Sequence, residues 1–168
     1  MGADRERGKM AEIKQYVEIL LESLKKKKSM LQNILEQNIR QEEVIRNNCD
    51  MDEFDRTVKL KRRYIWELES LDSGFEKVYV RIKEELSEVK EHHRDEISQM
   101  QKLISEITDL SVRIQASEER NKKLVETYFS YTRGKIRESK KSVRVASDYY
   151  KSMSGTNYTD ARLMDRKN

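Results

Sequence analysis

The residues of this sequence that could do chemistry are few and are not grouped for catalysis. The only histidines, His92 and His93, are adjacent, and Val89 and Lys90 stand three positions before them. A di-metal centre in a helical bundle needs a glutamate three positions before each histidine, so its motif is absent. His92 and Glu96 are four residues apart, which allows only weak metal binding. We therefore expect two solvated histidines and no metal site.

The sequence also lacks the residues that nucleophilic catalysis or phosphate transfer would need. The sequence has no glycine-rich phosphate loop and no nucleophile, base and orienting group at a recognisable spacing. Its single cysteine, Cys49, cannot form an internal disulfide, which is typical of a reducing compartment. We expect this thiol to be incidental to function. The sequence thus predicts neither an enzyme nor a cofactor.

The segment 124–153 is the part of the chain whose residue types indicate a binding surface. Tyrosines replace leucines along its apolar stripe, and basic residues outnumber acidic ones. Buried tyrosine hydroxyls need partners, whereas tyrosine, methionine and arginine are enriched at protein interfaces. We expect an amphipathic helix of a partner protein to bind in a groove beside this segment. The expected contact residues are Leu124, Tyr128, Phe129, Tyr131, Ile136, Val143, Tyr149, Tyr150 and Met153.

Two other interpretations of this segment remain open, ordinary packing and contact with nucleic acid. The formal net charge is only +4, from 35 basic and 31 acidic residues. Proteins that bind nucleic acid or membranes usually carry a larger and more segregated basic excess. The charge balance therefore favours a protein partner.

The composition predicts long helices to carry these residues. The chain of 168 residues has no proline and five glycines, with 39% charged and 36% apolar residues. Proline costs about 3 kcal/mol inside a helix, so its absence leaves helices uninterrupted. A narrow apolar stripe on each long helix needs less apolar material than a compact globule does. We expect an all-α fold, an antiparallel coiled coil or elongated helical bundle.

The apolar stripes place three helices within one helical domain, residues 10–153. The first is expected over 10–47, and Asn47 to Asp50 end it, because asparagine tolerates the left-handed conformation. Asp50 and Glu53 form a capping box for a second helix, which should fold back antiparallel. That helix is expected over 51–115, with a kink or short turn near Gly74 as an alternative. A lone rod of that length needs a partner stripe, so it must either fold back or dimerise. A third is expected over 117–153.

The ends of the chain carry no apolar periodicity. Residues 1–9 are polar and are expected to be flexible, and residues 154–168 are expected to form a disordered tail. The first twenty residues lack the apolar run of a signal peptide, and no stretch is long enough to cross a membrane. We therefore expect a cytoplasmic location.

Two side chains within the helices raise specific expectations. Lys27 occupies a stripe position, where its methylenes can lie along the seam while its ammonium stays in water. Trp66 flanks the stripe residue Ile65, which favours core packing or a boundary position over contact with a partner.

Several local sequences together are similar to one family. These are a Lys-Arg and Leu-Glu-rich stretch at 59–71, LDSGFE at 71–76, ERNKKL at 119–124, DYY at 148–150 and DRK at 165–167. Over essentially its whole length the chain resembles the FlgN-type flagellar export chaperones of bacteria, which serve type III protein export. None of these stretches resembles a catalytic signature.

The resemblance implies a function and partners. Family members bind the C-terminal region of hook-associated proteins, prevent its aggregation and deliver it to the cytoplasmic domain of the flagellar export gate. For this sequence the resemblance implies that the client docks on segment 124–153. It also implies that the protein contacts the membrane only through the gate. Formation of a homodimer stays open. Secretion chaperones are often acidic, whereas this chain has a pI near 9.0. We therefore expect a client that offers acidic helices, or a different contact with the gate.

One alternative of another class stays open, a structural coiled coil that dimerises through its seam and has no client. A permanent elongated dimer in light scattering would support it. A compact monomer or weak dimer that binds a client would support the chaperone.

Overall fold

The apolar stripes form long helices that pack side by side. The structure, a computed structural model, describes residues 2–132 and 139–154, with the side chains of 144–153 in the second stretch. Its elements are α1 (Gly2–Arg46), α2 (Met51–Glu88), a short 3₁₀ helix η1 (Lys90–His93), α3 (Arg94–Tyr131) and α4 (Ser139–Ser154). The described residues contain no strand, which confirms the all-α prediction.

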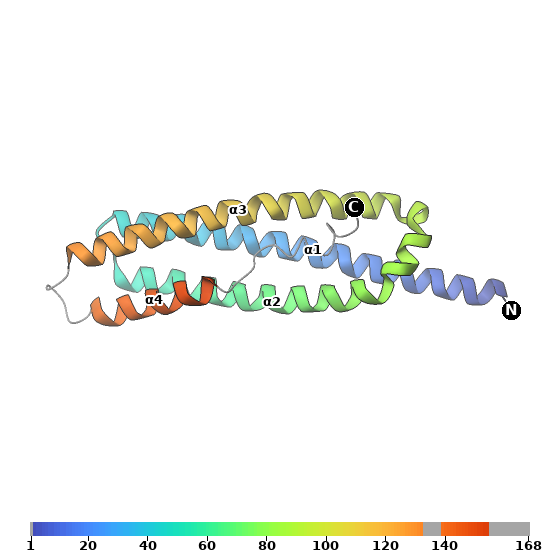
Figure 1. The fold of residues 1–168 in the computed structure, drawn as a ribbon, viewed down its shortest axis with the longest axis horizontal. Coiled ribbons are helices and arrows are strands. Elements are labelled where there is room, and N and C mark those ends of the chain that lie inside the picture. Colours follow the sequence, from blue (N-terminus) through green and yellow to red (C-terminus); the bar gives the residue numbers. More distant parts are fainter. Residues whose placement is uncertain (1, 133–138, 155–168) are drawn as a thin grey trace.

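Helix α1 is the common partner of the two other long helices. It packs along both α2 and α3, whereas α2 and α3 make few contacts with each other. In Figure 1, α2 runs antiparallel to α1, and α3 runs parallel to it. The short helix α4 lies against α2 and α3 near the α1–α2 turn. One end of the bundle is therefore built from four helices.

Local chemistry determines the turn between α1 and α2. The predicted Asp50 cap is present, whereas the Glu53 carboxylate pairs with Arg40 instead of closing the capping box. Asn48 and Cys49 have left-handed backbones, with φ of 69° and 46°. The Asp50 side chain caps α2 by accepting from the backbone N–H groups of Asp52 (3.0 Å) and Glu53 (3.4 Å). The Glu53 carboxylate accepts from Arg40 at 2.8 Å, which ties the start of α2 to α1.

The prediction of one helix over 51–115 is wrong in its later half. Helix α2 continues through Gly74 without a break, and the chain reverses at η1 after Val89. A glycine costs only about 1 kcal/mol in a helix, and the stripe keeps its register across it. Folding back near Val89 lets both halves of the stripe pack against α1, which a single rod could not do within one chain.

Other predicted boundaries also differ. Helix α3 passes through 115–117 without interruption and ends at Tyr131, and residues 2–9, expected to be flexible, are the first turns of α1. The continuous third helix predicted over 117–153 is divided, because α4 begins only at Ser139. Most of the predicted tail, 155–168, lies outside the described residues. No described helix combines the length and apolarity needed to span a bilayer.

The buried apolar side chains form two clusters along the bundle. The first lies among α1, α2 and α3. Its buried members are Ile13, Val17, Leu20, Leu21, Leu24, Leu31, Ile34, Leu68, Phe75, Tyr79, Ile82, Leu86, Met100, Ile107, Leu110 and Ile114. The second, here called the end cluster, lies beside the α1–α2 turn. Its buried members are Val44, Ile45, Cys49, Phe54, Val58, Val125, Ala146 and Tyr149.

Three side chains lie elsewhere than the sequence predicted. Trp66 is 70% exposed on the outer side of α2, so the expectation of core packing or a boundary position is wrong. His92 is exposed as predicted, but His93 is only 6% exposed, because the α2–α3 reversal turns its ring inward. The Lys27 ammonium is buried and donates to Asp72 at 2.7 Å instead of remaining in water. The methylenes of Lys27 do lie between the helices, as predicted.

Candidate partner-binding interface

A layer of buried polar side chains separates the two apolar clusters. We call it the polar layer. Its members are Asn38 and Gln41 of α1, Thr57 and Lys61 of α2, and Ser117, Glu118 and Asn121 of α3. The layer lies between the two clusters, since each of these helices carries apolar core residues on either side of it. Burial of a polar group costs free energy unless the group finds a hydrogen-bond partner. The hydrogen bonds within this layer therefore decide whether it stabilises the bundle.

Lys61 is the centre of the polar layer and is completely buried. Its Nζ donates to Asn38 Oδ1 at 2.7 Å and to Gln41 Oε1 at 3.1 Å. It also lies 2.9 Å and 3.2 Å from the two carboxylate oxygens of Glu118. One ammonium therefore joins α1, α2 and α3. Burial lowers the pKa of Lys61 to about 8, and the Glu118 carboxylate opposes that shift.

The amide side chains complete the layer. Asn38 Nδ2 donates to Ser117 Oγ at 2.7 Å, and Gln41 Nε2 donates to Thr57 Oγ1 at 3.2 Å. Asn121 Nδ2 donates to the backbone carbonyl of Asn38 at 2.9 Å. These bonds link α1 to both neighbours at one level, and a shift of register would break them together. The layer therefore fixes how the helices align along the bundle.

Helix α4 joins this network through one residue. The Tyr149 hydroxyl donates to Glu118 Oε1 at 2.7 Å, and its ring centroid lies 4.2 Å from Lys61 Nζ. The ring thus makes a cation–π contact with the ammonium while its hydroxyl hydrogen-bonds the carboxylate. Tyr149 covers the buried ion pair on the side where α4 lies.

Aromatic side chains surround Tyr149 in the end cluster. Tyr128 and Phe129 form an edge-to-face pair with ring centroids 5.4 Å apart, and Tyr149 and Tyr150 form another at 5.2 Å. The Tyr150 hydroxyl is buried without a hydrogen-bond partner in the described part of the chain. Burial raises the pKa of Tyr150, and the nearby Glu118, Glu126 and Glu119 raise it further.

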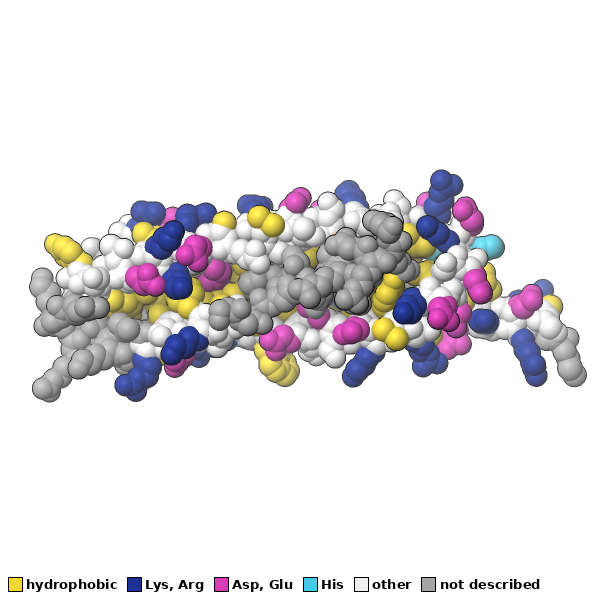
Figure 2. Space-filling model, in the orientation of Figure 1, with side chains coloured by type: hydrophobic (Ala, Val, Ile, Leu, Met, Phe, Trp, Pro, Cys, Tyr) yellow, Lys and Arg dark blue, Asp and Glu magenta, His cyan; other side chains and the backbone are white. Residues whose placement is uncertain are grey.

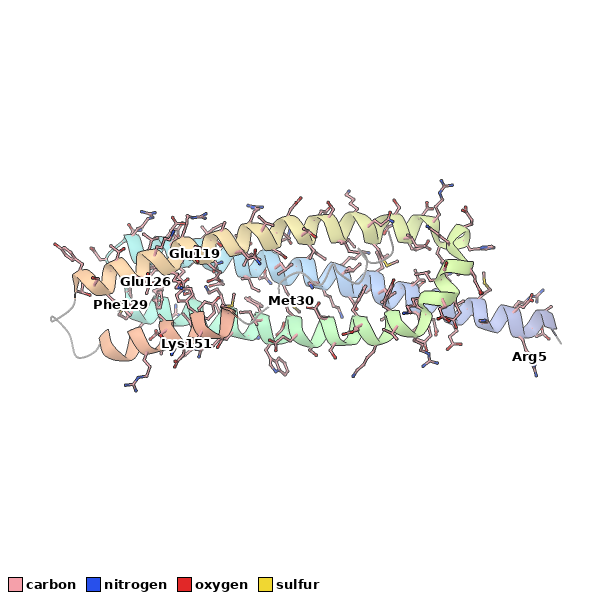
Figure 3. The ribbon with its side chains drawn as sticks, in the orientation of Figure 1. Arg5, Met30, Glu119, Glu126, Phe129 and Lys151 are labelled. Carbon is pink, nitrogen blue, oxygen red and sulfur yellow. The ribbon has the colours of Figure 1, made fainter. Side chains whose placement is uncertain are left out.

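The seam between α3 and α4 shows hydrophobic side chains on its surface with acidic side chains beside them (Figure 2). Glu119, Glu126 and Phe129 lie along the side of α3 that faces α4, and Lys151 lies on α4 (Figure 3). Both glutamates are exposed, whereas Phe129 is half-buried. The seam is therefore apolar at its base and acidic along its α3 edge.

The structure brings most of the predicted contact residues together. Leu124, Tyr128, Phe129, Tyr149, Tyr150 and Met153 all belong to the end cluster or pack against it. Only Tyr149 among them is fully buried, and the others are half-buried. Tyr131 is 90% exposed at the end of α3. Ile136 and the side chain of Val143 lie outside the described residues.

Sequence reasoning did not identify the polar layer. Asn38, Gln41 and Lys61 occupy stripe positions of their helices, where they interrupt an apolar pattern. The available signal was that polar residues interrupt all three stripes. Their pairing depends on the relative register of the helices, which only the folded structure supplies.

Comparison with known proteins identifies the family. The family model described as FlgN protein matches residues 10–154. No curated protein and no solved structure gave a significant match. The match begins within α1 and extends over α2, α3 and α4 to the end of the last helix. It therefore includes both apolar clusters and the polar layer. The chain therefore belongs to the FlgN family of flagellar chaperones.

Proposed function

We propose that this protein is a cytoplasmic chaperone that binds the C-terminal helical region of hook-associated proteins. It prevents premature aggregation of that region and delivers it to the cytoplasmic domain of the flagellar type III export gate. Membership of the FlgN family supports a role in flagellar export in general. The choice of client and the delivery step go beyond that membership and rest on the argument below.

The half-buried aromatic surface at the end of α3 is the observation that carries the proposal. Tyr128 and Phe129 remain partly exposed although they pack against the end cluster, and Tyr131 projects into solvent. Rigid aromatic rings gain contact area with little loss of conformational entropy, which makes them frequent anchors of protein interfaces. A client helix that covers these rings would bury apolar area that the chain alone leaves wet.

We extend the proposed contact surface to all nine residues that the sequence singled out. They are Leu124, Tyr128, Phe129, Tyr131, Ile136, Val143, Tyr149, Tyr150 and Met153. A disordered client region that folds on binding loses conformational entropy at that moment, which keeps the affinity moderate and release possible. Such reversibility suits a protein that must hand its client on.

The alternative function, a structural coiled coil without a client, has less support. The apolar stripes of α1, α2 and α3 are buried against one another within a single chain. A permanent coiled-coil dimer needs a continuous apolar seam between chains. The stripes are already used inside the bundle, so they do not supply that seam.

Binding of a client segment tests the proposal directly. The full chain would be titrated with the C-terminal segment of the hook-associated protein from the same organism. Tyr131→Ser should weaken binding by about tenfold or more, since anchor residues contribute about 2 kcal/mol or more. The matched control is Val112→Ser, because Val112 is 59% exposed on the outer side of α3. Equal affinity of all three proteins would contradict the proposal.

A further inference from the structure

We propose that α4 acts as a self-ligand that occupies the client's site, and that Glu118 favours displacement by a client helix that offers it an aromatic hydroxyl. This inference rests on the proposed function, since it names what a favoured client carries. It concerns the part of the end cluster that α4 covers, and it narrows the proposed contact surface to the residues of α3, because Tyr149, Tyr150 and Met153 leave with α4.

The way α4 is held supports the first half of the proposal. This helix has 16 residues, whereas α2 and α3 have 38 each, and it packs on α2 and α3 at one end of the bundle. Among the side chains that the structure describes in this helix, 144–153, Ala146 and Tyr149 are buried. The three long helices bury their stripes mainly against one another, so their association does not depend on α4. The shortness of α4 and its position at one end of the bundle therefore make it exchangeable.

The chemistry beneath α4 supports the second half. Glu118 is a buried carboxylate, and it accepts from Lys61 at both of its oxygens and from the Tyr149 hydroxyl at Oε1. A helix that replaces α4 and carries phenylalanine at this point keeps the ring above Lys61 but leaves Glu118 without the third hydrogen bond that Tyr149 donates. The lost hydrogen bond to a buried charged group is expensive, so the site discriminates strongly against an analogue that lacks the hydroxyl.

The spacing of α4 defines the helix that fits. Ala146, Tyr149 and Met153 are separated by three and four residues and therefore share one face. Ala146 is buried and small, which lets the helix backbone approach α2 and α3, and Met153 is half-buried against both apolar clusters. The matching client helix carries a small residue, a tyrosine three positions later and a flexible apolar residue four positions after that.

Exchange of α4 in solution tests the proposal without any client. A fluorescent peptide of residues 139–154 would be titrated into the full wild-type chain and into full-length Tyr149→Ala. The variant weakens its own α4, so it should bind the peptide at least tenfold more tightly than wild type does. Equal affinity would overturn the self-ligand, and circular dichroism confirms that the three long helices persist in the variant.

A pair of peptides that differ only in the Tyr149 hydroxyl tests the selection by Glu118. The peptide with Tyr149→Phe should bind full-length Tyr149→Ala about tenfold more weakly than the native peptide, because only the hydroxyl differs. In the double variant Tyr149→Ala with Glu118→Gln, the two peptides should differ much less. Equal binding of both peptides to Tyr149→Ala would contradict the proposed selection.

Competition with a client separates this inference from the proposed function. The C-terminal segment of a hook-associated protein should displace the peptide from full-length Tyr149→Ala. A segment that binds without displacing the peptide overturns the inference and leaves the chaperone function standing. A segment that does not bind at all contradicts the chaperone function. Concentration-dependent dimerisation of the wild-type chain in light scattering, lost in Tyr149→Ala, would show α4 exchange between copies and would also contradict a self-ligand.

Discussion

The Tyr149 hydroxyl of α4 donates to Glu118 Oε1 of α3 at 2.7 Å, directly beside the ion pair that Glu118 makes with Lys61. This contact links the aromatic end cluster to the polar layer, and it is the point at which α4 meets the centre of the bundle. The stability of the bundle, the docking of α4 and the binding surface at the end of α3 therefore depend on the same few side chains.

The first prediction concerns the docking of α4. Tyr149→Phe keeps the ring but removes the hydrogen bond to a charged acceptor, which typically contributes about 1.5–3 kcal/mol. Hydrogen exchange should therefore become at least tenfold faster at the amides of α4 than in wild type, with α1 little changed. Tyr131→Phe is the matched control, because its ring is exposed. Unchanged exchange in Tyr149→Phe would contradict the role of the hydroxyl.

The second prediction concerns the buried ion pair. Lys61→Met or Glu118→Leu alone leaves one buried charge without its partner, so each should lower the free energy of unfolding by about 3–5 kcal/mol. The double variant should recover most of that loss, since an apolar pair can replace a buried ion pair at little cost. Urea denaturation of the four proteins measures the coupling. Additive losses would show that the two residues act independently.

The third prediction is a dependence of stability on pH. Because burial lowers the pKa of Lys61 from 10.5 to about 8, the unfolded chain binds more protons at this residue between those values. Stability should therefore rise with pH in that window, by about 1 kcal/mol from about pH 8 to about pH 9, and Lys61 should add no slope at lower pH. Burial raises the pKa of the Cys49 thiol from 9.0 to about 11. This thiol therefore opposes the rise in stability only above about pH 9, where it begins to ionise in the unfolded chain.

Urea denaturation at the two pH values measures this effect. The control is the double variant Lys61→Met with Glu118→Leu, which removes the titrating amine together with its partner. The rise should be present in wild type and absent from the control. A rise of equal size in both proteins would assign it to other groups.

The fourth prediction tests the continuity of α2. Gly74 lies inside this helix, and a Cβ atom added there would have no neighbour within 4 Å. Gly74→Ala should therefore raise the free energy of unfolding by about 1 kcal/mol, the usual difference between these residues in a helix. Thermal denaturation measures it. A lower melting temperature would indicate a turn at this position instead.

The sequence was sufficient to predict features that depend on neighbouring residues. The spacing of Ile13, Val17 and Leu20 placed the buried side of α1. Asn48 and Asp50 predicted where α1 ends and how α2 begins, since left-handed and capping residues act on their own backbone.

Features that depend on contacts across the bundle could not be predicted in this way. The reversal near Val89 contains no proline or glycine, and it is favoured only because α1 offers a surface to both halves of the stripe. Lys61 and Glu118 are 57 residues apart in the chain, so their pairing needs the register of two helices. The aromatic cluster was predicted from residue types alone, but its coverage by α4 was not.

Hydrogen exchange of the full chain, with and without the C-terminal segment of a hook-associated protein, tests the chaperone function most directly. The proposal predicts slower exchange in the last turns of α3, about residues 121–131, and little change near η1 at the opposite end of the bundle. Protection centred on η1 or on the first turns of α1, with the end of α3 unchanged, would contradict it.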